Sequence, residues 1–293
     1  MDQQEWLAQQ FEEQRPHLRA VAYRMLGSLS EADDAVQDAW LRLSRADRSD
    51  VENLRAWLTT VVARVALNML RSRSTRREQA LDVRVPDPIV DPADGTDPEH
   101  EALLADSVGL ALLIVLETLS PAERLAFVLH DMFAVPFDEI APIVERSPEA
   151  TRQLASRARR RVRGAEPTPD ADLSAQWEVV DAFIAAARGG DFDALVAVLD
   201  PDIVLRSDGG AAAGLSQYVR GAKAVAGQAM MWARVDLTMR RALINGAAGM
   251  VTYLRGQPFA ICAVTVKNGR LAEIDFLADP ERIGQLDLTV LSD

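Results

Sequence analysis

The sequence predicts a multidomain protein with two all-α domains followed by a C-terminal α+β domain. The chain has 293 residues, which is enough for two or three compact domains. Apolar residues recur at helical spacing in the first half, whereas strand-like runs appear only after residue 236. A proline-containing acidic segment divides the helical part. The expected domains are therefore residues 1–80, 108–165 and 173–293, with a linker at 81–107.

Three helices are predicted in the first domain. Apolar residues between Leu18 and Leu26 define the first helix, which Gly27 ends. Ser30 is expected to cap the second helix, whose apolar stripe runs through 35–43. The third stripe runs through 57–69, so the domain is predicted to be a helical bundle.

The third helix carries a basic face beside a polar loop. Arg64, Asn68 and Arg71 recur at i, i+4 and i+7, and the loop Arg48–Asn53 precedes the helix. The segment 41–78 has a net charge of +5. A solvated helix face is the alternative interpretation of this block taken alone.

The segment 82–106 is acidic, with a net charge of −7 and four prolines. It has almost no apolar periodicity, so we interpret it as a tether.

A helix-turn-helix follows the tether. Phe137–Val144 predicts one short helix, Ser147 is placed to cap the next, and Pro148 suits its first turn. The stretch SRARRRVR at 156–163 holds five arginines, although the whole chain has a net charge of −12. Adjacent arginines repel one another unless an anion neutralises them, so the second helix is predicted to bind nucleic acid in a major groove. Its outward face comprises Arg152, Ser156, Arg159, Arg160 and Arg163, and its inward face includes Thr151 and Ala155.

The C-terminal domain begins with two amphipathic helices, at 177–187 and 192–199, separated by Gly189-Gly190. Strands are predicted at 236–244, 249–254, 259–267 and 270–277. Asn268-Gly269 between the last two is a strong hairpin signal. The pattern predicts helices packed on an antiparallel sheet.

Three stretches resemble a known family. YRMLGSLSEADDAVQDAWLRL at 23–43 and NLRAWLTTVVARVALNMLRSR at 53–73 are similar to region 2 of extracytoplasmic-function sigma factors of bacterial RNA polymerase. The stretch from Leu116 to Arg163 is similar to region 4, and LRSDGG at 205–210 resembles the glycine-rich motif of the subgroup with a fused SnoaL-like domain. The resemblance implies two all-α sigma domains, the region 2 bundle and the region 4 helix-turn-helix, plus a SnoaL-like cone.

The resemblance also implies partners and site residues. The partners would be promoter DNA and the polymerase core, through its beta-prime clamp helices and beta flap. Core polymerase would bind Asp33, Asp34, Val36, Gln37, Asp38, Trp40 and Leu41. The minus 10 element would bind Arg48, Asn53, Arg64, Asn68 and Arg71, by capture of a single strand. The minus 35 element would bind Ser147, Thr151, Arg152, Ser156, Arg159, Arg160 and Arg163.

The resemblance further predicts regulation in cis, with no separate anti-sigma protein. The linker segment Val83–Ile89 is expected to contact Asp208, Gly209 and Gly210 together with the tail segment Asp279–Ile283, in which Asp279 and Pro280 are the candidate residues. The two glycines would allow close backbone approach, and a simple turn is the alternative. The acidic tether would run through the cationic channel of the polymerase towards the RNA exit.

Other functions remain as alternatives at this point. A catalytic pocket would use Asp208, Tyr218, Tyr253 and Asp275, but the C-terminal domain has no histidine, and a regulatory or ligand-sensing domain is preferred over an enzyme. A pocket there would also hold a small ligand. A one-component helix-turn-helix regulator is the second alternative, and it leaves 23–77 without a role.

Composition limits the chemistry further. The single cysteine, Cys262, is expected in the core, the three histidines are too scattered for a zinc site, and no cofactor or metal is expected. No membrane span or basic leader is predicted, so we expect a cytoplasmic protein.

Overall fold

The computed structural model describes residues 3–45, 53–77, 84–95, 109–165, 172–211 and 214–291. These residues form two compact units. The helical unit contains the residues up to 77 and 115–165. The sheet unit contains 84–95, 109–114 and the residues from 172 onward. Among the described residues, no helix is long and apolar enough to cross a membrane.

The helical unit begins with the predicted bundle of α1 (Gln3–Leu26), α2 (Leu29–Leu43) and α3 (Leu54–Arg77). Gly27, at a φ of 62°, ends α1 as expected. The cap of α2 differs from the prediction: Ser28 takes this role in place of Ser30, and its hydroxyl accepts a hydrogen bond from the Glu31 amide. The residue with extended backbone directly before the helix is the one that can reach the exposed amides.

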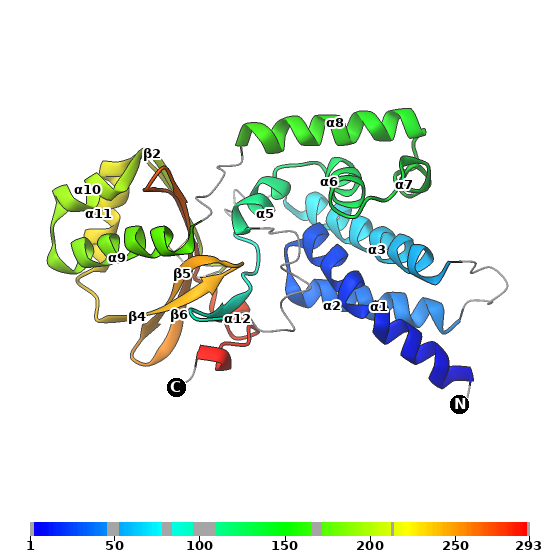
Figure 1. The fold of residues 1–293 in the computed structure, drawn as a ribbon, viewed down its shortest axis with the longest axis horizontal. Coiled ribbons are helices and arrows are strands. Elements are labelled where there is room, and N and C mark those ends of the chain that lie inside the picture. Colours follow the sequence, from blue (N-terminus) through cyan, green and yellow to red (C-terminus); the bar gives the residue numbers. More distant parts are fainter. Residues whose placement is uncertain are drawn as a thin grey trace. The chain divides into compact units, whose positions relative to one another are not determined.

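The second half of the helical unit contains the predicted helix-turn-helix. Its elements are α5 (Leu110–Glu117), which spans both units, α6 (Pro121–Phe127), a π-helical turn η2 (Val128–Met132), α7 (Phe137–Val144) and α8 (Pro148–Ala165). Figure 1 shows α8 lying over α6 and α7, and α8 is in contact with both. Glu145, at a φ of 58°, ends α7 and starts the turn into α8.

The bundle and the helix-turn-helix share one interface. The Arg124 guanidinium donates hydrogen bonds to the backbone oxygen of Arg24 at 3.2 Å and to Glu117 at 2.8 Å. The Phe133 ring lies edge-on to His17 and beneath the guanidinium of Arg24. Because Arg24 and Arg124 are almost fully buried there, these groups join the two halves of the unit firmly.

The sheet unit holds seven strands in the order β1-β4-β5-β6-β7-β2-β3. The bounds are β1 (Val90–Pro92), β2 (Leu199–Asp208), β3 (Gln217–Arg220), β4 (Leu237–Ile244), β5 (Ala247–Leu254), β6 (Gln257–Lys267) and β7 (Arg270–Leu277). All neighbouring strands are antiparallel except β2 and β7, which are parallel. The four strands predicted from the sequence are β4 to β7.

Three of the described helices cover one face of this sheet, and the short helix at Pro280–Ile283 lies against β6. The helices α9 (Leu173–Gly189), α10 (Phe192–Val198) and α11 (Ala222–Trp232) pack with the strands around a core that includes Val180, Leu195, Val225 and Ile274. The helix α12 (Pro280–Ile283) contacts β6, and a 3-10 turn η3 (Thr289–Leu291) contacts β1. This is the α+β architecture expected of the C-terminal domain.

The described part of the acidic segment belongs to the sheet unit. Val85 and Ile89 are each 1% exposed, and β1 adds to the edge of β4 with Val90 opposite Ile244. The sequence predicted a tether without secondary structure here, with a contact from Val83–Ile89 to Asp208, and so did not predict β1. The prediction missed this strand because three residues carry no periodicity of their own; the partner edge determines their conformation.

Candidate nucleic-acid interface and linker site

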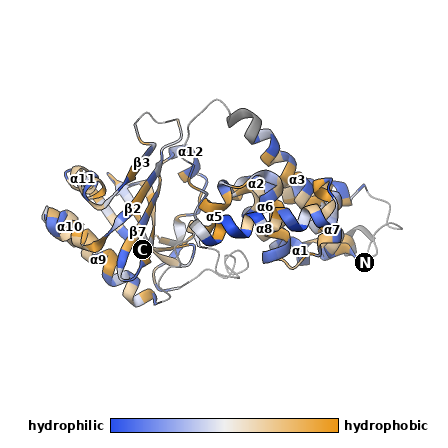
Figure 2. Cartoon of the chain, turned by 90° about the horizontal axis from the view of Figure 1, so that it is seen from above, coloured by the Kyte–Doolittle hydropathy of each residue, from blue (hydrophilic) through white to orange (hydrophobic). Residues whose placement is uncertain are grey.

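The helix α8 presents a cationic face built on a buried one. The Ser147 hydroxyl accepts a hydrogen bond from the Ala150 amide at 3.2 Å, which starts the helix. Ala155 and Ala158 are fully buried against α6 and α7, and this packing directs the opposite side of the helix, which carries Arg152, Arg160 and Arg163, outward. Figure 2 shows the hydrophilic side of α8 in blue.

Acidic residues on neighbouring elements neutralise part of this cationic face. Asp131 accepts a hydrogen bond from Arg159 at 2.5 Å, and Glu123 accepts bonds from Arg157 at 3.0 Å and Arg161 at 3.2 Å. Burial acts to raise the pKa of Glu123, but the hydrogen bonds from Ser120 and Arg157 outweigh it and hold this pKa below its ordinary value. The mutual repulsion of the arginines is therefore relieved in part within the protein.

The remaining arginines of α8 are better placed for an outside anion. Arg160 and Arg163 are exposed and form no ion pair with any described carboxylate. The Arg152 guanidinium lies over the Phe137 ring at 5.3 Å, and Ser156 is exposed beside it. Among the predicted minus 35 residues, Thr151 is misplaced: it is fully buried and its hydroxyl donates to the Ser147 backbone oxygen, so it cannot reach a groove.

The basic face of α3 lies where the sequence placed it. Arg64, Asn68 and Arg71 are all exposed along one side of the helix. Asn53 caps α3, because its side-chain oxygen accepts a hydrogen bond from the Ala56 amide at 3.1 Å. Arg48 lies outside the described residues.

Arg282 joins the linker to the sheet unit. Its guanidinium forms ion pairs with Asp87 of the linker and with Asp208 of β2 and donates a hydrogen bond to the Val85 backbone oxygen. The Asp208 carboxylate also accepts a hydrogen bond from the Val85 amide at 3.0 Å. The side chains of both aspartates are 8% exposed, so each charge is compensated away from water.

The predicted glycines and tail residues support this junction. A β-carbon on Gly210 would overlap the Asp279 carboxylate, and a β-carbon on Gly209 would overlap Leu215. Asp279 in turn caps α12 by accepting from the amides of Glu281 and Arg282, with Pro280 in the first turn. Asn245 adds a second attachment, because it accepts from the Ile89 amide at 3.0 Å. We define the linker site as Val85, Asp87, Ile89, Asp208, Asn245 and Arg282.

Comparisons with known proteins agree with this arrangement. The family models for Sigma-70 region 2 and Sigma-70 region 4 match residues 10–76 and 110–162. The chain is 38% identical over 292 residues to the ECF RNA polymerase sigma factor SigJ of Mycobacterium tuberculosis, covering 93% of this chain and 92% of SigJ. This chain belongs to the extracytoplasmic-function sigma factors. It is also 33% identical over 273 residues to the probable sigma factor SigI of the same organism, with 93% of each covered.

A solved structure extends the likeness to the whole sigma factor. The crystal structure of Mycobacterium tuberculosis SigJ superposes with a TM-score of 0.76 at 36% identity, over 96% of this chain and 99% of that one. The match therefore includes the sheet unit as well as the helices of regions 2 and 4.

The surface of α2, where the sequence predicted core polymerase to bind, divides into exposed and buried residues in this sigma factor. Asp33, Asp34, Gln37 and Leu41 are exposed, and Leu41 is a large apolar residue at 43%. Val36 is 1% exposed and belongs to the core of the bundle, so it supports this surface from within and does not contact a partner directly. Asp38 pairs with Arg42, and Trp40 packs against the Phe11 ring at 5.1 Å.

The sheet unit has an apolar pocket between α9, α11 and the sheet, and the four residues considered for catalysis are not among those that line it. Asp208 and Asp275 alternate along β2 and β7 with the pocket-lining Ser207 and Phe276, and so face the other side of the sheet. Burial raises the pKa of Asp275 to about 6 against the opposing effect of its ion pair with Arg206. Tyr218 is 59% exposed, and Tyr253 is absent from the lining as well.

Proposed function

We propose that this sigma factor directs promoter-specific initiation by RNA polymerase and regulates itself through the linker site. The observation that supports this most is that α3 and α8 each present an exposed cationic surface, in a chain that matches both Sigma-70 regions. Arg64, Asn68 and Arg71 of α3, with Asn53 and Arg48 before them, would hold the minus 10 element as a single strand.

The helix α8 would read the minus 35 element as duplex DNA. Arg152, Arg160 and Arg163 would contact phosphates and guanine edges, with Ser147 and Ser156 at the sides of the helix and Arg159 available after it leaves Asp131. The exposed part of α2, including Asp33, Asp34, Gln37 and Leu41, would bind the beta-prime clamp helices of the core enzyme. Region 4 would also contact the beta flap.

Regulation in cis follows from where the linker is held. The segment from Val85 to Pro92 cannot be buried in the sheet unit and extended through the polymerase channel at the same time. The sheet unit would therefore compete with polymerase for the linker, at the high effective concentration of a fused domain. Asp208, Gly209, Gly210, Asp279 and Pro280 would act by shaping the linker site. We assign the sheet unit a regulatory and not an enzymatic role.

Run-off transcription with purified core polymerase tests the sigma activity. We expect promoter-dependent transcripts only when both the core enzyme and this chain are present. Tight binding of the chain alone, as a dimer on palindromic DNA, with no transcript, would instead support a one-component regulator.

Variants of the linker site test the regulation separately. Arg282→Gln is expected to change transcription and the affinity for core polymerase, because it releases Asp87 and Asp208. Arg220→Gln is the matched control, since Arg220 pairs with Asp202 on the exposed surface of the same unit. Equal activities of the two variants and the wild type would reject regulation through this site while leaving the sigma activity intact.

A further inference from the structure

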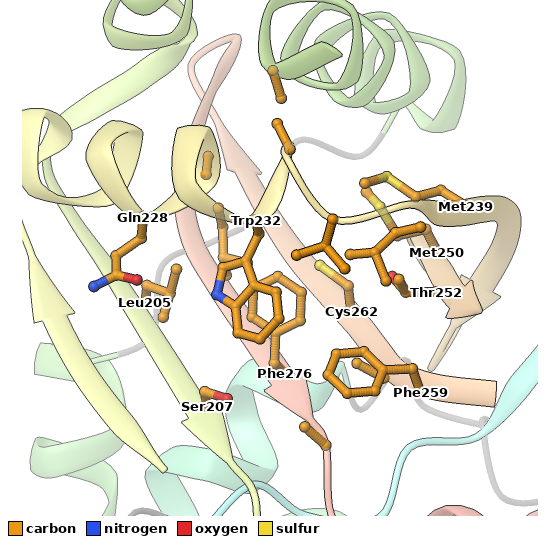
Figure 3. Close-up of a pocket in the computed structure, with 18 of the residues that line it drawn as sticks. Leu205, Ser207, Gln228, Trp232, Met239, Met250, Thr252, Phe259, Cys262 and Phe276 are labelled. Carbon is orange, nitrogen blue, oxygen red and sulfur yellow. The ribbon is translucent and has the colours of Figure 1, made fainter. Parts of the chain in front are cut away.

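The sheet unit contains an apolar cavity that the sigma activity does not use. The cavity has a volume of about 150 Å³ and lies between α9, α11 and the helix-covered face of the sheet. Figure 3 shows Trp232, Phe259, Phe276, Met239, Met250 and Cys262 around it. Its lining includes two exposed apolar residues, Trp232 at 37% and Val235 at 38%, so the cavity opens to solvent at this side and an occupant can enter. An apolar pocket with few polar groups is the usual form of a small-molecule site. Its volume is that of a cavity that accepts a benzene ring.

One polar group in the cavity lacks a partner. The side-chain oxygen of Gln228 is buried and accepts no hydrogen bond from any described residue. Gln228 comes from α11, and in Figure 3 its amide oxygen is directed toward Leu205. Leaving a buried acceptor unpaired is unfavourable, so a hydrogen-bond donor within the cavity would complete the site.

The lining also restricts the charge of an occupant. Among the described residues, the lining contains no aspartate, glutamate or histidine, and its single charged residue, Arg188, is exposed to solvent. A buried cation would have no counter-ion there, and no carboxylate or imidazole is present to act as a general base. Burial raises the pKa of the Cys262 thiol, which keeps it protonated and unreactive. The cavity is therefore suited to binding and not to chemistry.

We propose that this cavity is a binding site for a small neutral aromatic molecule that carries one hydroxyl or N–H group, which donates a hydrogen bond to the Gln228 side-chain oxygen. The aromatic ring would contact Trp232, Phe259 and Phe276, where aromatic pairing adds to the burial of apolar surface. This inference does not depend on the proposed function, because direct binding tests it without transcription.

Phenol and toluene are suitable probes, because they have the same size and differ in the donor. Each is titrated calorimetrically into the full-length chain and into Gln228→Leu. We expect phenol to bind the wild type with one site, and the ratio of the phenol Kd to the toluene Kd to rise at least about fivefold in the variant, because the phenol hydroxyl loses its acceptor. An unchanged ratio would overturn the role of Gln228, and absence of saturable binding of phenol would overturn the site.

Two further variants locate the binding. Ala229→Leu adds volume from α11 into the cavity and is expected to abolish binding of both probes. Gln257→Leu is the control for removing a glutamine, because Gln257 is exposed at the start of β6 and lies outside the lining. Binding that persists unchanged in Ala229→Leu would place the probes elsewhere.

Methionine methyl NMR provides a test on the wild type, which does not depend on whether a variant folds. Phenol is expected to shift the methyl signals of Met239 and Met250, which line the cavity, and to leave Met25 unchanged in the core of the helical unit. Shifts at Met25 without shifts at Met239 and Met250 would reject the proposed site.

Discussion

At the scale of single residues, Arg282 is the side chain on which the linker site depends. It forms ion pairs with two buried aspartates, and removing it would take the Arg282 charge away from both carboxylates. Arg282→Ala is therefore expected to destabilise the sheet unit by about 3 to 5 kcal/mol, the usual cost of breaking a buried ion pair. Arg220→Ala should cost less than about 1 kcal/mol, because its pair is exposed. Urea unfolding of both variants measures the difference, and equal midpoints would contradict the assignment.

His17 makes the helical unit sensitive to pH. Burial, followed by the positive charges of Arg55 and Arg24, lowers the pKa of His17 from 6.5 to about 4. Its Nδ1 is 3.2 Å from the Arg55 guanidinium and its Nε2 is 3.2 Å from the Thr59 hydroxyl. Between pH 6.5 and about 4 the unfolded chain binds a proton that the folded chain does not, so stability is complete above pH 6.5 and decreases as pH falls.

The test is calorimetric unfolding of the wild type and His17→Gln between pH 7.5 and 5. The unfolding temperature of the wild type is expected to fall further over this pH range than that of the variant, because the glutamine does not titrate. The same pH slope in both proteins would show that His17 does not carry this dependence.

At the scale of elements, the arginines of α8 are expected to differ in their effect on promoter binding. Arg160→Ala and Arg163→Ala remove cations that no described carboxylate neutralises. Where the arginine contacts a base, each substitution should weaken the free energy of promoter binding by about 1 to 3 kcal/mol. Where the contact is to phosphate alone, the slope of log K for promoter binding against log salt concentration should decrease in magnitude by about one. Arg157→Ala should have a smaller effect, because Glu123 already engages that guanidinium.

Promoter binding by the holoenzyme, measured at several salt concentrations, distinguishes these cases. Arg234→Ala serves as the control, because Arg234 is exposed in the sheet unit. Unchanged binding in both Arg160→Ala and Arg163→Ala would remove α8 from the interface.

The sequence predicted elements well wherever a strong local signal determines them. Regular apolar spacing identified α1 to α3, α7 and α8, and the turn at Asn268-Gly269 identified the hairpin of β6 and β7. The prediction extended the helix α10 to Leu199, although this residue begins β2. The strands β1, β2 and β3 and the helix α11 were missed, because sheet pairing and packing override weak local preferences there.

The candidate sites were predictable in outline but not in detail. Spacing placed Arg64 and Asn68 outward and Val36 and Thr151 inward, and the structure agrees. The family resemblance nevertheless named Val36 and Thr151 among the contact residues, and their burial corrects that assignment. The contact between the linker and Asp208 is as expected. Its central residue, Arg282, lies within the expected tail segment Asp279–Ile283, but no local signal singled it out, because its partners lie far away in sequence.

At the scale of the whole molecule, the proposed function gives the linker two incompatible positions. In the free chain it is part of the sheet unit, where the amides of Val85 and Ile89 donate to Asp208 and Asn245. In the proposed initiation complex the same segment runs through the polymerase. Binding of core polymerase would therefore have to overcome the free energy that holds the linker, and weakening the linker site would reduce that cost.

Hydrogen exchange on the full-length chain tests this competition directly. In the free protein the amides of Val85 and Ile89 should exchange slowly, because both are buried and hydrogen-bonded. Core polymerase is expected to speed their exchange by about ten- to a hundredfold, equivalent to losing about 1.4 to 2.7 kcal/mol of protection. The amide of Ala248 is the control, since it donates to Gln176 within the same unit at 3.0 Å and its exchange should not change.

Arg282→Gln should speed exchange at Val85 without polymerase. If Val85 and Ile89 stayed protected in the polymerase complex, the linker would remain on the sheet unit during initiation, and the competition would be disproved.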